Sequence, residues 1–337
     1  MRTIALTSAT ACLLALSMAG MANAEDPAGE ANQIADAIND VAPPVEGTAR
    51  TTIEDTGDAD GKLTAQSETL DAAIPAESTG EVQLDTAYAS DDATLKVGLP
   101  SGASSEEAVL SDDGTVIYPE TFAATDVAVQ AFEDGISIQA VLSGPEAPGE
   151  FAYPVDLPDG GTITADEGGG VVVLDADGGL VGGFAPPWAK DAAGNDIPTH
   201  FEIQGTSVVQ VVEHSSGTQY PVVADPWLWR DLIHSASWTK YPEGWTLKVT
   251  PTLWARGFAG SHLVGAAGWN ELYSKYRNRG LNTNLDGMRD QYICHQEIVA
   301  IRSPRKATWN LDEWRPDYSY WQTVNSSCNP GGAKWFD

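Results

Sequence analysis

The charge and the tryptophan content of the chain both change at Pro226. A single domain rarely combines two such different compositions. Residues 1–225 contain 5 Lys and Arg against 38 Asp and Glu, whereas residues 226–337 contain 13 against 10. Ten of the eleven tryptophans also follow residue 226. Asp225-Pro226 favours an extended, non-helical backbone at the same point. A length of 337 residues allows two domains, so we predict a boundary between residues 225 and 226.

The first 24 residues have the features of a secretory signal peptide. Arg2 precedes a mostly apolar run from Ile4 to Met21, and Ala22-Asn23-Ala24 follows with small residues at the cleavage positions. The apolar run is too short to cross a membrane as a helix, so we expect no transmembrane segment. The sequence therefore predicts a protein secreted from the cell after cleavage near Ala24.

Residues 25–90 are rich in Ala, Asp, Glu and Thr and poor in aromatic side chains. Such a segment buries little apolar surface to offset chain entropy, so it is predicted to be an acidic, largely disordered leader. The exception is residues 28–41, where Ile34, Ile38 and Val41 fall on one helical face and predict a short helix.

The sequence pattern of residues 91–225 is typical of an all-β, sandwich-like domain. Short apolar and β-branched runs recur about every ten residues and are separated by Asp-Gly, Gly-Gly or Pro-containing turns. The clearest runs are 94–99, 115–118, 127–132, 136–142, 162–164, 171–174 and 208–212. Chemically reactive side chains do not cluster here, because His200 and His214 are isolated. We interpret this domain as a scaffold or pro-domain.

Residues 226–337 predict a small α+β domain. A short turn at Pro242–Gly244 separates two alternating runs, and Asn282–Asn284 offers capping residues before a second helical pattern. The expected elements are strands at 235–241 and 245–254, a flexible glycine-rich link at 257–268, helices at 269–279 and 285 to about 301, and a short helix-like piece before Cys328.

Cys294 and Cys328 are the two cysteines that remain after signal-peptide removal. Disulfides persist outside the cytoplasm, so we predict a bridge between them. It would close a loop of roughly 35 residues and stabilise the fold by about 3 to 4 kcal/mol. Two cysteines alone cannot form a four-ligand zinc site, and no metal site is expected.

Three motifs identify a family resemblance. Asn282–Gln296, Trp309–Pro316 and Cys328–Pro330 are similar to the actinobacterial family called domain of unknown function 2599, over about residues 230–337. The resemblance implies no activity and supplies no catalytic residues. The segment Tyr220–Pro226 looks like the leader region of other secreted actinobacterial proteins whose C-terminal modules differ.

One functional hypothesis is an extracellular hydrolase or toxin-like enzyme. Its candidate catalytic residues are His295, Glu297, Asp312 and Arg315, which supply a possible acid–base group and an anion clamp. Asp290 cannot pair with His295, because helical positions five apart point about 140° away from each other. The enzyme hypothesis requires the four candidates to lie together in a concave site.

The leading hypothesis is a secreted precursor whose disulfide-closed, Trp-rich C-terminal domain binds a cell-envelope polymer or a surface protein, including one on a competitor cell. Exposed aromatic side chains and basic clusters mark such contacts. The binding candidates are Trp227, Trp229, Trp314, Trp321, Arg302, Arg305 and Lys306. No nucleotide fingerprint, nucleophile elbow or zinc-ligand helix is present, so neither a cofactor nor a specific nucleic acid partner is expected. The sequence leaves the oligomeric state open.

Overall fold

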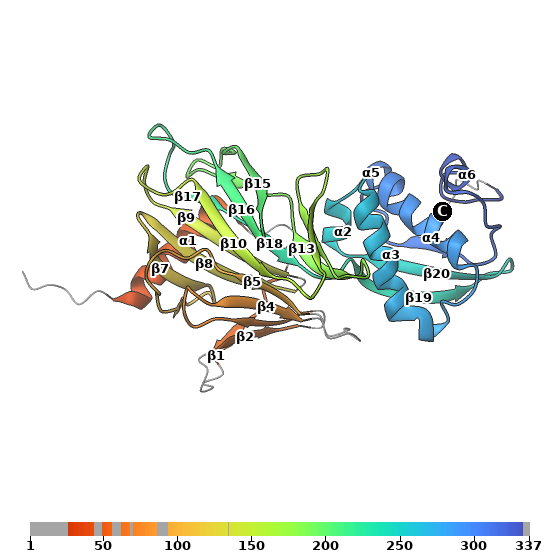
Figure 1. Ribbon diagram of the computed structural model, residues 1–337, viewed down its shortest axis with the longest axis horizontal. Coiled ribbons are helices and arrows are strands. Elements are labelled where there is room, and N and C mark those ends of the chain that lie inside the picture. Colours follow the sequence, from red (N-terminus) through yellow and green to blue (C-terminus); the bar gives the residue numbers. More distant parts are fainter. Residues whose placement is uncertain are drawn as a thin grey trace, which may run out of the picture.

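Two lobes lie end to end along the long axis of the molecule (Figure 1). This computed structural model describes residues 26–43, 49–55, 62–67, 70–85, 94–133 and 135–332. The expected signal peptide, residues 1–24, lies outside the described residues. The larger lobe is made of β-strands with one helix, and the smaller C-terminal lobe combines helices with a three-stranded sheet.

The larger lobe consists of two antiparallel sheets that face each other. The first sheet has the order β1-β2-β3-β4-β5-β10-β16-β15. Its strands are β1 (Ile53–Asp55), β2 (Leu63–Gln66), β3 (Asp71–Ile74), β4 (Glu81–Asp85), β5 (Leu95–Gly98), β10 (Glu150–Asp156), β15 (Thr199–Gln204) and β16 (Ser207–Val212).

The second sheet has the order β11-β12-β13-β18-β9-β8-β7-β6, with β17 also pairing with β9 and β14 pairing with β17. Its strands are β6 (Val109–Leu110), β7 (Val116–Phe122), β8 (Thr125–Phe132), β9 (Gly135–Leu142), β11 (Thr162–Ala165), β12 (Val171–Leu174), β13 (Leu180–Phe184), β14 (Ala189–Lys190), β17 (Val222–Ala224) and β18 (Trp227–Trp229).

The core of the β lobe lies between these two sheets. In β9, Ile136, Ile138 and Ala140 face the core between the sheets, whereas Val141 faces the helix α1 (Pro27–Val41) on the outer side. Every residue of β9 is buried as a result. The sandwich-like fold predicted from the alternating runs is therefore confirmed, with burial on both faces of its central strands.

The N-terminal region differs from its composition-based expectation. Residues 25–90 were expected to be largely disordered, yet their described parts form α1, which agrees with the expected helix, and strands β1–β4. The apolar residues are few but alternate strictly: Leu63 and Ala65 are buried in β2, and Val82 and Leu84 in β4. A sheet face needs only every second residue to be apolar, and neighbouring strands supply the rest of the core.

The β lobe extends past the boundary predicted between residues 225 and 226, because the strand β18 belongs to it. Trp227 pairs with Ser137 of β9, and Phe184 of β13 pairs with Leu228. The β lobe therefore continues through Trp229, and the C-terminal lobe begins after it. The rise in tryptophan content after Pro226 begins in this strand, because Trp227 and Trp229 of β18 lie at the interface between the lobes.

The C-terminal lobe packs helices on the sheet β19-β20-β21. Its elements are β19 (Ile233–Lys240), β20 (Trp245–Pro251), α2 (Leu253–Gly257), α3 (His262–Tyr276), the 3-10 turn η1 (Arg277–Arg279), α4 (Leu285–Cys294), the π-helical segment η2 (His295–Val299), α5 (Ala300–Arg302), β21 (Trp309–Asp312) and α6 (Tyr320–Asn325). The α+β composition, the hairpin and the long second helix agree with the sequence analysis.

The glycine-rich stretch at 257–268 is not a flexible link over its second half. Ser261 caps α3 by accepting a hydrogen bond from the Val264 backbone N–H, and the helix starts at His262. A Cβ on Gly268 would lie 2.3 Å from the Tyr292 hydroxyl oxygen of α4. Glycine therefore allows two helices to approach closely here. A glycine-rich composition alone does not show whether the glycines serve close packing or a flexible link.

The lobes share a continuous apolar core. The Trp229 ring centroid lies 5.4 Å from that of Phe258, and a Cβ on Gly170 would lie 2.3 Å from the Phe258 ring. Around this contact, the Ser261 hydroxyl donates to the Asp166 carboxylate, and the Arg230 guanidinium lies 3.6 Å from a carboxylate oxygen of Asp85. The β lobe therefore covers the surface formed by the end of α2 and the start of α3.

The predicted disulfide is present. Cys294 at the end of α4 is bonded to Cys328, with a Cα–Cα distance of 5.5 Å, and both residues are buried. The bridge joins the central helix of the C-terminal lobe to the segment that follows α6. This segment carries Ser327 and Cys328 in left-handed backbone conformations.

Replacing Trp229 by Ala should destabilise the full chain by about 3 to 5 kcal/mol, because the side chain is fully buried and its removal leaves a cavity between the lobes. Urea unfolding followed by circular dichroism measures this loss. Trp245→Ala is the matched control, because this exposed Trp should contribute less than about 0.5 kcal/mol. Equal effects of the two substitutions would contradict the shared core.

Reduction of the disulfide should lower the free energy of unfolding by about 3 to 4 kcal/mol, because the unfolded chain regains the freedom of the 34-residue separation. Denaturation of the oxidised protein and of the same protein with reductant measures the difference. Unchanged midpoints would show that the bridge has no stabilising role.

Candidate functional site

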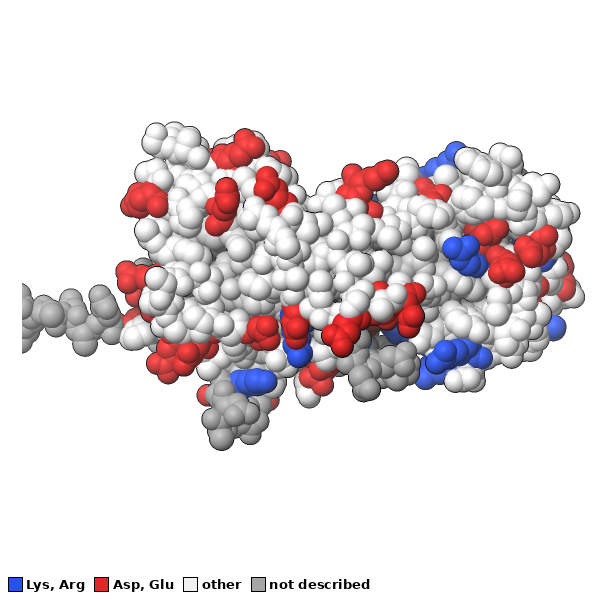
Figure 2. Space-filling model, viewed as in Figure 1, with Lys and Arg blue, Asp and Glu red and all other residues white. Residues whose placement is uncertain are grey.

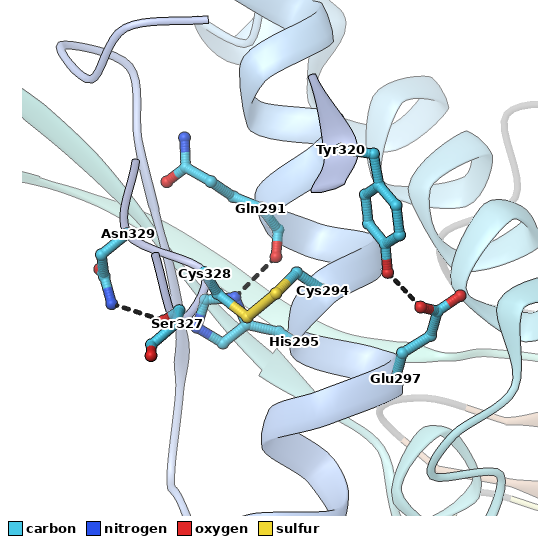
Figure 3. Close-up of a disulfide and its surroundings, with 8 residues drawn as sticks. All are labelled: Gln291, Cys294, His295, Glu297, Tyr320, Ser327, Cys328 and Asn329. Atoms are coloured by element: carbon cyan, nitrogen blue, oxygen red, sulfur yellow. Dashed lines mark hydrogen bonds between the residues drawn. A yellow bond between two sulfur atoms is a disulfide. The ribbon is translucent and has the colours of Figure 1, made fainter. Parts of the chain in front are cut away.

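The Cys294-His295 pair lies where α4 continues into the π-helical segment η2 (Figure 3). π-helical turns are uncommon and occur frequently at functional sites, so the side chains of this segment are candidates for a site. His295 and Glu297 leave the helix on different sides (Figure 3), as residues two positions apart do.

His295 is part of the core and does not reach solvent. Its side chain is buried against Trp309, and its Nδ1 lies 2.7 Å from the Gln291 carbonyl oxygen, to which it donates. Burial, with a smaller contribution from the nearby Lys306 charge, lowers the pKa of His295 from 6.5 to about 4. His295 is therefore neutral at pH 7 and has a structural role rather than access to a substrate.

Asp312 and Arg315 bind each other and the chain around them. The Arg315 Nε donates to Asp312 at 2.5 Å, and the Thr246 hydroxyl donates to the other carboxylate oxygen at 2.5 Å. Arg315 also donates to the backbone carbonyls of Pro330 and Gly332 at 3.2 and 3.1 Å. These bonds hold the C-terminal segment beside β21 and leave Arg315 with little capacity to act as an anion clamp.

Glu297 lies in a different environment, on the surface between three helices. Its carboxylate accepts hydrogen bonds from the Tyr320 hydroxyl of α6 and from His262 at the start of α3 (Figure 3 shows the first). Burial raises the pKa of Tyr320, and the bond to Glu297 raises it further. The His262 side chain remains 64% exposed, and its ring meets that of Tyr320 edge-on at 6.0 Å.

The four candidates of the hydrolase hypothesis therefore do not form one open site. His295 and Asp312 both bond to Gln291, but both are buried. His295 faces the core, Asp312 and Arg315 form a structural pair, and Glu297 bonds to His262 and Tyr320. Sequence reasoning missed His262 and Tyr320 because they precede and follow Glu297 by 35 and 23 residues, and only the packing of α3 and α6 against η2 brings them together.

Two of the binding candidates are corrected by their burial. Trp227 is 7% exposed and Trp229 is 0% exposed. The Trp227 ring packs against Phe132 at 4.3 Å and against Trp254 at 4.8 Å. Both were expected to be exposed, but they are two positions apart and therefore share one face of β18, which Trp254 and Phe258 of the C-terminal lobe cover.

Exposed aromatic side chains instead surround the turn between β19 and β20, at the end of the molecule away from the β lobe (Figure 1). Each ring has a cation over it: the Lys240 Nζ lies 5.0 Å from the Trp245 centroid, and the Lys248 Nζ lies 5.4 Å from that of Tyr241. The third pair is Arg315 over Trp314, at 4.5 Å. We call these residues, Lys240, Tyr241, Trp245, Lys248, Trp314 and Arg315, the hairpin-tip cluster.

Gly244 gives Trp314 its place in this cluster. A Cβ at position 244 would lie 2.5 Å from the Trp314 Cβ, so any larger residue would displace the ring. The sequence analysis identified Trp314 and the turn but not Tyr241 or Trp245. The alternation of aromatic and basic residues in the two strands of the hairpin could have predicted this cluster. Pairing of the strands places Lys240 opposite Trp245, so the cation and the ring meet.

The remaining binding candidates lie near α5 and α6. Trp321 is 73% exposed, and Arg302 and Arg305 are exposed, whereas Lys306 is half-buried. Trp321 follows Tyr320, so it lies next to the group formed by His262, Glu297 and Tyr320. Ile301, which the sequence analysis did not select, is 61% exposed beside Arg302.

A groove in the β lobe has a different chemistry. It has a volume of about 690 Å³ between α1 and the strands β7–β9, and its wall includes Glu30, Glu120 and Asp126. Burial raises the pKa of Asp126, and the Glu30 and Glu120 charges raise it further. The acidic lining repels anions and offers no basic group to bind one.

Across the described ranges, no three or more His, Cys, Asp or Glu residues are grouped so as to hold a metal ion. The helices in that part of the chain are too short or too polar for one of them to span a membrane.

Comparison with known proteins gives matches to the C-terminal lobe. Residues 233–331 match the family described as a protein of unknown function (DUF2599), as the sequence motifs indicated. Uncharacterized proteins of Mycobacterium bovis and of two Mycobacterium tuberculosis strains are 31% identical to this chain over 103 residues, which is 31% of this chain and 68% of each relative. No solved structure matches the chain. The family match contains the hairpin-tip cluster and the group around Glu297.

The buried His295 should make stability depend on pH. Between pH 6.5 and 4 the unfolded chain binds a proton at this residue that the folded chain excludes. The stabilisation is therefore complete above pH 6.5 and is lost as the pH falls towards 4, by up to about 3 kcal/mol. Urea unfolding of the native protein and of His295→Gln across this range isolates the contribution. The exposed His234→Gln is the control, and parallel pH curves for all three proteins would refute the assignment.

Proposed function

The chain belongs to the family of proteins of unknown function DUF2599, and we propose that its C-terminal lobe is an extracellular binding module that recognises an anionic polymer of the cell envelope. We propose further that the hairpin-tip cluster is the ligand site. The family supplies no activity to transfer, so the proposal rests on the chemistry of exposed side chains in the matched region.

The observation that carries the proposal is the set of three exposed aromatic rings, each with a Lys or Arg within about 5 Å of its centroid. Aromatic faces stack on the C–H faces of sugar rings, and Lys240 and Lys248 pair with phosphate or carboxylate groups. Arg315 is held by Asp312 and contributes its contact with the Trp314 ring. A polymer that combines sugars with such anions satisfies both parts of the cluster.

The position of the cluster also supports a binding role. It lies at the end of the molecule away from the β lobe, so the acidic lobe does not cover it (Figure 1). The secretion predicted from the sequence would bring the module to the envelope, and the buried disulfide is compatible with that location. The hydrolase alternative is not favoured, because His295 and Asp312 are buried, Arg315 is held by Asp312 and backbone carbonyls, and Glu297 bonds to His262 and Tyr320 instead.

We expect the double substitution Trp245→Ala/Trp314→Ala to weaken binding to insoluble mycobacterial cell-wall material by about tenfold or more, because it removes two stacking faces. Co-sedimentation of the full mature chain measures the affinity. Lys240→Gln/Lys248→Gln should weaken binding less and should reduce its dependence on salt, because two of the cationic contacts are lost.

Tyr273→Ala is the matched control for the double substitution. Tyr273 is an exposed aromatic on α3 that stacks on Trp269 and lies outside the hairpin-tip cluster. All variants are first checked for an unchanged thermal transition. The proposal fails if the native chain does not sediment with the envelope material, or if the double variant and Tyr273→Ala bind equally well.

A further inference from the structure

A second exposed surface lies at the start of α3, at α5 and at α6. Trp321 and Ile301 are the two most exposed large hydrophobic side chains in the described part of the chain. Ile301 lies 3.2 Å from where a Cβ of Gly260 would be, and His262 follows two residues later. The His262 ring meets Tyr320, whose ring centroid lies 6.4 Å from that of Trp321. These contacts join the side chains into one surface.

Positive charge flanks this surface. Arg302 follows Ile301 directly, and Arg305 lies four residues after Ile301. Both arginines are exposed. Of the nearby carboxylates, Glu297 accepts from Tyr320 and His262, and Asp290 lies 4.0 Å from the Arg289 guanidinium. Asp317, before α6, is an exposed acid close to Asp290. We call Ile301, Arg302, Arg305, His262, Tyr320 and Trp321 the α5–α6 patch.

The charge distribution of the whole molecule determines which lobe faces a negatively charged surface. Acidic side chains predominate on the visible face of the β lobe, whereas basic ones appear together with acidic ones on the C-terminal lobe (Figure 2). Residues 1–225 hold 38 Asp and Glu against 5 Lys and Arg, and the remaining residues hold 10 against 13. In front of a negatively charged surface the β lobe is repelled, so the C-terminal lobe turns towards that surface.

We propose that the α5–α6 patch docks on the surface of an anionic lipid bilayer. Trp321 and Ile301 enter the interfacial region, where Trp is favoured because its ring is apolar and its N–H remains hydrated. Arg302 and Arg305 lie at the level of the anionic headgroups. The combination of two strongly exposed apolar side chains with flanking arginines fits this partner, and the contact is peripheral and reversible. This proposal is independent of the ligand proposed for the hairpin-tip cluster.

Vesicle co-sedimentation of the full mature chain tests the proposal. The protein should bind phosphatidylcholine vesicles that contain about 30 mol% phosphatidylglycerol at least about tenfold more tightly than vesicles of phosphatidylcholine alone. Ile301→Ser/Trp321→Ala should reduce binding to the anionic vesicles by about tenfold, because the inserted apolar groups are lost. Arg302→Gln/Arg305→Gln should weaken binding and flatten its salt dependence. The exposed positions allow these variants to fold, which an unchanged thermal transition verifies.

Trp245→Ala/Trp314→Ala separates this proposal from the proposed function. It should retain vesicle binding while losing envelope-polymer binding, and Ile301→Ser/Trp321→Ala should show the reverse. Absence of binding to anionic vesicles, equal binding to neutral vesicles, or full binding by Ile301→Ser/Trp321→Ala would overturn the proposal. Loss of vesicle binding only on deletion of residues 333–337 would also overturn it, because the lipid contact would then be the C-terminal segment.

Discussion

The packing of Trp227 and Trp229 between the lobes is the contact on which the rest of the structure depends. The strand that carries them is hydrogen-bonded into the β lobe, while their rings contact Trp254 and Phe258 of the C-terminal lobe. One strand thus completes a sheet and supplies part of the core of its neighbour. The glycine at position 170 is required by the same contact, because a side chain there would occupy the space of the Phe258 ring.

Within the C-terminal lobe, the polar residues of the central helix organise the core rather than a reaction centre. The Gln291 side chain donates to the backbone oxygen of Asp312, and the Gln296 side chain donates to the backbone oxygens of Ala255 and Phe258. These bonds tie the central helix to α2 and to β21 through buried amide groups. The disulfide adds a covalent link on the same helix. The adjacent residues Cys294, His295 and Gln296 are therefore accounted for by the disulfide and by buried hydrogen bonds.

The side chains left on the surface have the chemistry of recognition. One end of the lobe presents aromatic rings paired with cations, and the region around α5 and α6 presents Trp321 and Ile301 with two arginines. Neither group is needed to fill the core. Exposed large apolar side chains add little to stability and promote unwanted association, so their concentration in the C-terminal lobe supports the two binding proposals made for it.

The sequence by itself determined the classes of structure and several particular features. Regularly spaced apolar runs separated by turns identified the β lobe, capping residues located the helix that begins at Leu285, and the two cysteines in a chain with a predicted secretory signal indicated their bond. These signals are local, or involve a single possible pair. Composition was less informative for residues 25–90, because a strand that borrows its core from neighbouring strands needs few apolar residues of its own.

Only the tertiary structure decided which of the tryptophans are exposed and which candidate residues meet. Trp229 and Trp321 both have charged or polar neighbours in the sequence, yet one is enclosed by two lobes and the other faces solvent. His262, Glu297 and Tyr320 come together only because three helices converge. Exposure and side-chain contact depend on what covers a residue, and residues distant in the sequence provide that cover.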